Sequence, residues 1–150
     1  MAGNESFRDL FFEEAEDLLA SLSDDLVRLN VGTPDNEIVH SIFRAVHSIK
    51  GSAGAFSLDE LVGFAHRYET VLDEVRSDRL ELSPDVFKVV QRSADHLAVL
   101  VEAARTEKST DKTVTDAALA ALDAFLDENV PDTANQSEGI SEALESDNTL

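Results

Sequence analysis

The stretch from Ile38 to Phe56 must satisfy two different requirements within one predicted helix. At about 100° per residue, its apolar side chains fall on a single side, as they do in helices that pack into a core. This apolar stripe consists of Ile38, Ile42, Ala45, Ile49 and Phe56. His47 falls almost directly opposite, so the helix must bury one side and expose a histidine on the other.

The surroundings of His47 are unusual for an ordinary surface histidine. Within one or two helical turns of it lie His40, Arg44, Lys50, Gly51 and Gly54. Glycine in a helix costs about 1 kcal/mol relative to alanine, and larger side chains at positions 51 and 54 would crowd the imidazole. A lone helical histidine usually has no chemical role. The glycines and the lysine nevertheless favour a chemically active His47 that another protein approaches closely.

The net charge of −19, from 31 acidic and 12 basic residues, excludes two classes of partner. Such a surface repels phosphate backbones and anionic lipids, and no cluster of basic residues in the sequence offsets it. We therefore expect neither nucleic acid nor a membrane as a partner. Long-range attraction would instead favour a protein with a positive face.

The sequence contains no cysteine, so a disulfide framework and a thiolate metal site are both excluded. Its N-terminus lacks the basic segment and apolar run of a secretion signal. No apolar run approaches the roughly 18 residues that a membrane span needs. We expect a cytoplasmic protein.

Apolar side chains at helical spacing predict five helices and no strand. The helices cover residues 5–30, 34–55, 58–77, 84–106 and 115–129. Four capping patterns mark the predicted starts of the later helices, namely Thr33 before Pro34, Ser57 with Glu60, Ser83 before Pro84, and Thr113 or Thr115.

Four amphipathic helices of about 20 residues joined by short loops predict an all-α, antiparallel up-down four-helix bundle over residues 5–107. The first helix is expected to bury Phe7, Leu10, Phe11, Leu18, Leu22 and Leu29, with Phe12 off this stripe. A shorter fifth helix, over 115–129, is expected to dock against the bundle ends. Residues 1–129 then form one domain, and residues 130–150 are predicted to be an acidic, flexible linker or tail.

The string HSIKGSAGAF at 47–56, followed by HRYE at 66–69, resembles the phosphorylation motif of histidine phosphotransfer (Hpt) domains. Among these it is most similar to the N-terminal Hpt domain of chemotaxis histidine kinases, the CheA family. The resemblance covers about residues 5–107. It departs from the commoner KGGAG form at Ser52, which lies off the His47 side of the helix.

This resemblance implies roles for four residues of the chain. His47 is the expected phosphoacceptor, Glu69 on the next helix is expected to orient it, and Lys50 and His66 are expected close by. If Glu69 accepts a hydrogen bond from Nδ1–H of His47, then Nε2 keeps its lone pair and becomes the nucleophile. Lys50 could compensate charge on the phosphoryl oxygens.

The resemblance also implies the partners of the chain. The phosphoryl group would come from ATP on a separate kinase domain, with Mg, and would pass to an aspartate of a response-regulator receiver domain that holds Mg of its own. The sequence has no GxxxxGK[ST] loop and no second glycine-rich loop, so we expect no cofactor in this chain. The chain is then a phosphocarrier domain that looks like part of a protein-histidine kinase, and its status as an enzyme stays open.

A partner would approach along the second helix, over Gly51 and Gly54, with Arg44 beside them. If Phe12 and Phe43 are exposed, they would form the centre of this small, transient surface. Packing against a neighbouring helix is the slightly favoured interpretation of Phe43. We expect the isolated domain to be a monomer.

Three alternative functions remain open from the sequence. The first is a stand-alone Hpt shuttle. The acidic segment after residue 130 resembles the start of a linker to further domains and so favours a kinase fragment over this alternative. The second is a metal-binding bundle, although no Glu-x-x-His pair faces the predicted core. The third is a purely structural bundle, in which no phosphoryl label would ever reach His47. His96 is interpreted as an ordinary residue.

Overall fold

The computed structural model describes residues 2–31 and 35–129 of the chain. This part contains five α-helices and no strand, which confirms the predicted all-α class. The helices are α1 (Ala2–Val31), α2 (Asn36–Ala55), α3 (Asp59–Arg76), α4 (Pro84–Thr106) and α5 (Lys112–Asn129). The predicted linker or tail, residues 130–150, lies outside the described residues.

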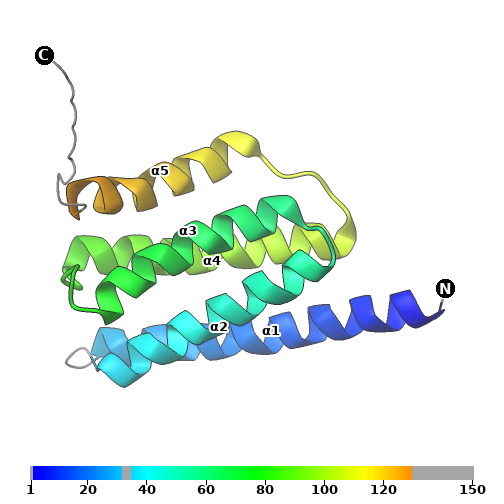
Figure 1. Ribbon diagram of the computed structural model, residues 1–150, viewed down its shortest axis with the longest axis horizontal. Coiled ribbons are helices and arrows are strands. Elements are labelled where there is room, and N and C mark those ends of the chain that lie inside the picture. Colours follow the sequence, from blue (N-terminus) through cyan, green and yellow to red (C-terminus); the bar gives the residue numbers. More distant parts are fainter. Residues whose placement is uncertain (1, 32–34, 130–150) are drawn as a thin grey trace, which may run out of the picture.

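The first four helices form the predicted antiparallel up-down bundle (Figure 1). Contacts join α1 to α2, α2 to α3, α3 to α4 and α4 back to α1, which closes the bundle. α5 runs alongside α3 and α4 on the outside of the bundle. The expectation that the fifth helix docks against the bundle ends is therefore wrong. The loop over residues 107–111 turns the chain back, so that α5 lies against the length of its neighbours.

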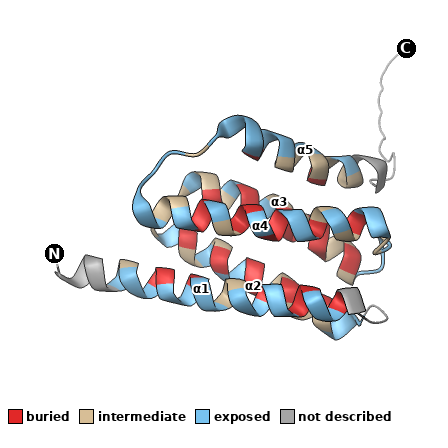
Figure 2. Cartoon of the chain, turned by 180° about the vertical axis from the view of Figure 1, so that it is seen from behind, coloured by how far each residue is buried: buried red, intermediate tan, exposed pale blue. Residues whose placement is uncertain are grey.

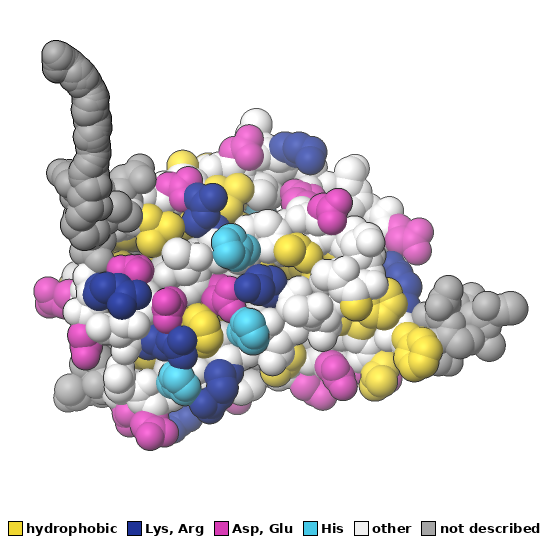
Figure 3. Space-filling view, viewed as in Figure 1, with side chains coloured by type: hydrophobic (Ala, Val, Ile, Leu, Met, Phe, Trp, Pro, Cys, Tyr) yellow, Lys and Arg dark blue, Asp and Glu magenta, His cyan; other side chains and the backbone are white. Residues whose placement is uncertain are grey.

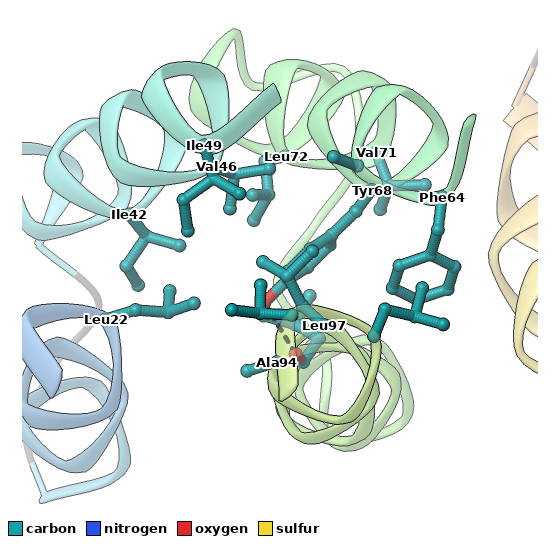
Figure 4. Packing of buried hydrophobic residues seen from close by; sticks show 14 of the residues in the cluster. Leu22, Ile42, Val46, Ile49, Phe64, Tyr68, Val71, Leu72, Ala94 and Leu97 are labelled. Atoms are coloured by element: carbon teal, nitrogen blue, oxygen red, sulfur yellow. Dashed lines mark hydrogen bonds between the residues drawn. The ribbon is translucent and has the colours of Figure 1, made fainter. Parts of the chain in front are cut away.

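The core lies between the four bundle helices and is built from their apolar stripes (Figure 4). Tyr68 is the largest fully buried side chain, and its hydroxyl donates a 2.8 Å hydrogen bond to the Val90 carbonyl. Burial raises the pKa of Tyr68 well above its usual value, and the charge of Asp95 raises it further. Buried residues follow the inner sides of the helices, and exposed ones follow the outer sides (Figure 2).

One predicted helix start is confirmed, and three are wrong. Ser83 caps α4, since its hydroxyl accepts from the Val86 amide at 3.2 Å, with Pro84 in the first turn. α2 instead begins after Asp35, whose carboxylate accepts from the Glu37 amide. The predicted cap Thr33 and Pro34 lie outside the described residues. An aspartate is at least as good an N-cap as a threonine, so Asp35, directly before the first residue of α2, can cap the helix.

The other two predicted caps, at Ser57 and at Thr113 or Thr115, are replaced by other arrangements. Ser57 has a left-handed backbone with φ of 56°, and α3 follows Leu58 without a side-chain cap bond. Glu60, the other half of the predicted capping box, accepts hydrogen bonds from Thr110 and Thr115. At the start of α5, the Asp111 carboxylate accepts a hydrogen bond from the Thr113 amide, so Asp111 takes the place of the predicted cap at Thr113 or Thr115.

The N-terminal part of α1 differs from its predicted packing. Phe7 and Leu10, expected in the core, are 65% and 50% exposed. Phe12, expected outside the stripe, is buried, with its ring edge-on to Phe11 and the Arg8 guanidinium 4.8 Å from its centre. The start of α1 reaches past the end of α2, so the side of the helix that carries Phe7 and Leu10 has no neighbour there (Figure 1).

A buried polar cluster fastens α5 to the bundle. The Thr115 hydroxyl donates to Glu60 of α3 at 3.2 Å, so it must accept the 2.9 Å hydrogen bond from Nε2–H of His96 on α4. His96 is 8% exposed and therefore is not the ordinary residue that the sequence suggested. Burial lowers the pKa of His96 against an opposing effect of the Glu60 charge, which keeps the imidazole neutral over most of the physiological pH range.

No helix in the described part of the chain is long and apolar enough to cross a membrane. Among the same residues, no group of three or more histidine, aspartate or glutamate side chains is arranged to hold a metal ion.

Replacing Thr115 with valine should destabilise the domain, because His96 and Glu60 would both lose a buried partner. We expect a loss of about 1–3 kcal/mol in the free energy of unfolding, measured by urea denaturation followed by circular dichroism. Thr106→Val is the matched control, since Thr106 is exposed and its hydroxyl bonds to the Glu102 carbonyl of its own helix. Equal stability of the two variants would show that the buried cluster does not hold α5.

Candidate functional site

The candidate site lies where α2 and α3 run side by side. Histidine side chains gather on this face of the molecule with lysine and arginine side chains around them (Figure 3). The apolar stripes of both helices point away from this face into the core, because Ile42, Ile49 and Tyr68 are fully buried. The packing that buries the stripes therefore sets the opposite sides of α2 and α3 next to each other at the surface.

His47 and Glu69 meet across the boundary between α2 and α3. The His47 side chain is 61% exposed, while that of Glu69 is 10% exposed. Nδ1 of His47 forms a hydrogen bond with Oε2 of Glu69. The structure thus places an exposed imidazole against a nearly buried carboxylate.

Lys50 completes this arrangement by bonding the second oxygen of the same carboxylate. Its Nζ donates to Oε1 of Glu69 at 2.5 Å, and the lysine side chain is 23% exposed. Glu69 is therefore held from both sides by residues of α2. Lys50 contacts the carboxylate that bonds His47 rather than standing free beside the imidazole.

The charge on Glu69 determines which tautomer His47 adopts. Burial acts to raise the pKa of Glu69, but the hydrogen bonds from Lys50 and His47 outweigh it and lower the pKa below its usual value. An ionised carboxylate only accepts hydrogen bonds, so Nδ1 of His47 must carry the proton that it shares with Glu69. A neutral His47 then has its lone pair on Nε2, which makes that atom the nucleophile of the site.

The other residues predicted for the site lie around this pair. His66 is exposed on α3, and its side chain makes no hydrogen bond or ion pair with His47, Lys50 or Glu69. Arg44 is exposed on α2, and Phe43 is half-buried with its ring parallel to that of His47. Phe12 is in the core, so it cannot form the centre of a docking surface. The roles of His66 and Arg44 stay predictions.

The two glycines leave open space beside the site. A Cβ added at Gly51 or Gly54 would meet no atom of the protein within 4 Å. The expectation that a larger side chain would crowd the imidazole therefore fails for the first added carbon. Both positions are exposed, so the room that they provide lies outside the domain, where a partner can use it.

Sequence reasoning missed two polar residues near the site, Arg76 and Asp73 of α3. Arg76 of α3 donates from Nη1 to Nδ1 of His40 at 3.1 Å and from Nε to Asp73 at 2.8 Å. Helical spacing fixes the side of one helix on which a residue lies, but it does not fix how far two helices slide along each other. The pairing of Arg76 with His40 depends on that second quantity.

The family model of the Hpt domain matches residues 6–128. This match spans the four-helix bundle and α5 and includes His47, Lys50 and Glu69. The chain therefore belongs to the Hpt domain family, as the motif around His47 predicted.

Curated relatives within this family are chemotaxis proteins. The chain is 49% identical over 130 residues to the chemotaxis protein CheA of Rhizobium meliloti strain 1021, covering 87% of the chain and 17% of that protein. It is 46% identical over 106 residues to CheA of Cereibacter sphaeroides, covering 69% of the chain and 16% of that protein. The chain thus spans about a sixth of the length of these relatives.

A solved structure has the same fold. The phosphorylated P1 domain of CheA3 from R. sphaeroides, crystallised in complex with CheY6, matches with a TM-score of 0.74. The match covers 83% of this chain and 98% of that one, at 22% sequence identity. The arrangement of five helices described above is therefore the arrangement of a known Hpt domain.

Replacing Glu69 with glutamine should reduce stability in a pH-dependent way. A lowered pKa in the folded state means that ionised Glu69 stabilises the fold above its unfolded value of 4.5. This contribution is lost as the pH falls through the lower folded pKa. We expect wild type to be more stable than Glu69→Gln at pH 7, with the difference shrinking below pH 4.5. Urea denaturation across pH 3–7 measures it, and a constant difference would contradict the charged pairing.

Proposed function

We propose that this domain carries a phosphoryl group on His47 within a chemotaxis-type histidine kinase. The observation that carries the proposal is the exposed imidazole whose Nδ1 is bonded to an ionised, nearly buried Glu69. That arrangement leaves Nε2 as a nucleophile facing solvent. Membership of the Hpt family and the similarity to CheA proteins support the same function.

The phosphoryl donor is proposed to be ATP with Mg, bound on a separate kinase domain in the cytoplasm. The Nε2 lone pair attacks the γ-phosphorus, a new N–P bond forms, and the P–O bond to ADP breaks with its electron pair leaving on ADP. The imidazole ring gains positive charge in this step. Glu69 stabilises that charge because its ionised carboxylate accepts the hydrogen bond from Nδ1–H of the ring.

The phosphoryl acceptor is proposed to be an aspartate of a response-regulator receiver domain, with Mg bound to the receiver. A carboxylate oxygen attacks phosphorus, the N–P bond breaks, and its electron pair returns to Nε2. The R. sphaeroides P1 domain was crystallised with CheY6, which supports a receiver as the partner. A stand-alone shuttle would use the same two steps, and similarity to CheA proteins favours the kinase.

The receiver is proposed to dock over Gly51 and Gly54 and onto the adjoining side of α1. Asp25 marks that side, because its carboxylate accepts a 2.7 Å hydrogen bond from Ser41 of α2. Phe7 precedes Asp25 by five helical turns at 3.6 residues per turn, so it faces the same way. The exposed Phe7, with Leu10 beside it, therefore replaces Phe12 as the apolar centre of this surface.

Replacing His47 with glutamine should abolish labelling by a CheA-type kinase domain and radioactive ATP. The fold should survive, because the His47 side chain is largely exposed. His40→Gln is the matched control, since His40 lies on the same side of α2 but its Nδ1 accepts from Arg76. Acid-labile, base-stable label on wild type and on His40→Gln is expected. Label that persists on His47→Gln would identify another acceptor.

Replacing Gly54 with leucine should slow phosphotransfer to a receiver while leaving the domain folded. The position has open space, and leucine is the better helix former. The measurement is the loss of label from phosphorylated wild-type and variant domains to one receiver. Gly63→Leu on α3 is the control, because Gly63 also has no neighbour within 4 Å of an added Cβ. Transfer at the wild-type rate by a folded Gly54→Leu domain would move the docking surface elsewhere.

A further inference from the structure

The Phe43 ring has two neighbours at the site, the imidazole of His47 and a guanidinium group from α3. The Phe43 and His47 rings are nearly parallel, 8° apart, with their centres separated by 6.0 Å. This separation is within the range of offset-stacked aromatic pairs. The Arg76 guanidinium carbon lies 3.7 Å from the Phe43 ring centre, in a cation–π contact.

Arg76 is itself held in place by two further contacts. Its Nε donates to Oδ1 of Asp73 at 2.8 Å, one helical turn earlier on α3. Its Nη1 donates to Nδ1 of His40 at 3.1 Å, across the boundary with α2. Because a guanidinium only donates, Nδ1 of His40 carries no proton. Asp73 and His40 therefore fix Arg76, and Arg76 in turn fixes Phe43.

The bond to Glu69 alone leaves the His47 ring incompletely positioned. One hydrogen bond at Nδ1 determines the tautomer, but an imidazole that is 61% exposed can still oscillate about its Cβ–Cγ bond. In-line attack on phosphorus requires the Nε2 lone pair to point in one direction, so rotation of the plane costs rate. The parallel Phe43 ring supplies the missing restraint, since rotation of the imidazole would break the stacking.

We propose that Phe43 is a positioning residue for His47 and that Arg76 acts through it. The inference rests on the proposed phosphotransfer function and adds a second element to its orienting machinery. Glu69 selects the tautomer, and the Arg76–Phe43 pair fixes the plane of the ring. Glu69 and Phe43 contact His47 from different helices, and Arg76 contacts Phe43 alone.

This role explains Phe43 better than docking does. An apolar centre of a docking surface must offer a free face to the partner. Phe43 is half-buried, packs against the core, and has Arg76 on its ring and His47 beside it. The exposed apolar side chains Phe7 and Leu10 on α1 are better suited to that purpose.

The test uses a small phosphoryl donor, so that docking of a kinase or receiver does not enter the rate. Phosphoramidate can phosphorylate Nε2 directly, because the P–N bond of the donor breaks and ammonia leaves as the new N–P bond forms. Phe43→Leu should react roughly two- to tenfold more slowly than wild type, the range expected for loss of one aromatic pair. Phe43→Tyr keeps the ring and should restore the wild-type rate.

The role of Arg76 is tested by combining variants. Arg76→Gln should slow labelling in the wild-type background, because Phe43 loses its cation. In the Phe43→Leu background the same change should have no further effect, since Arg76 acts through the ring. Equal slowing in both backgrounds would mean that Arg76 acts directly, and its part of the proposal would be wrong.

Spectroscopy separates positioning from a general loss of structure. In Phe43→Leu, ¹⁵N shifts of the His47 ring should still report a proton on Nδ1, because Glu69 is intact. ¹³C relaxation at Cε1 of His47 should show larger ring motion, while circular dichroism shows that the variant is still folded. Unchanged ring motion and an unchanged rate would overturn the proposal.

The outcomes also separate this inference from the function on which it rests. If phosphoramidate labels the wild-type domain but not His47→Gln, His47 is the phosphoacceptor, whatever the rates of the Phe43 variants. If wild type and His47→Gln are labelled equally, the proposed function itself fails. A labelled wild type with a Phe43→Leu variant of equal rate would remove only the positioning role.

Discussion

The candidate site depends on the two hydrogen bonds that the Glu69 carboxylate accepts from His47 and Lys50. A carboxylate that is 10% exposed must find compensation for the water it has lost, and here it finds two partners on the neighbouring helix. Those partners meet it only if α2 and α3 pack at the observed rotation and offset. The apolar stripes buried beneath them set both quantities. The stability of the bundle and the chemistry of His47 therefore have the same structural cause.

The sequence predicted the parts of the fold that depend on periodicity. Ile42, Ala45 and Ile49 of the predicted α2 stripe are buried as expected, because helical spacing alone decides which side of a helix a residue faces. The predictions were wrong where burial or capping depends on another helix packed against the residue. Phe7 and Leu10 belong to an apolar side of α1 that α2 is too short to cover, and Phe12 is buried instead. The predicted capping box failed because Ser57 has a left-handed backbone and Glu60 accepts hydrogen bonds from Thr110 and Thr115, which lie far along the chain.

The features of the candidate site also divide into those that helical spacing predicts and those that depend on how two helices pack. An exposed His47 opposite the stripe followed from spacing, whereas its pairing with Glu69 was expected only from the resemblance to Hpt domains. Spacing cannot say which turn of α3 lies beside which turn of α2. For the same reason the contact between Phe43 and Arg76 could not be predicted. The i, i+4 spacing of Phe43 and His47 was visible, and it was the available signal that the two rings lie together.

The charge distribution resolves an apparent conflict between the composition and the proposed chemistry. A net charge of −19 should repel the anionic phosphates of ATP. The acidic residues are most numerous on α1, however, whereas α2 has Glu37 as its one acidic residue and carries Arg44 and Lys50. Exposed charges more than about 8–10 Å apart are largely screened at physiological salt. For the proposed transfer, the charges that count are therefore those around His47, where Lys50 and Arg76 pair with Glu69 and Asp73 and Arg44 adds a further cation.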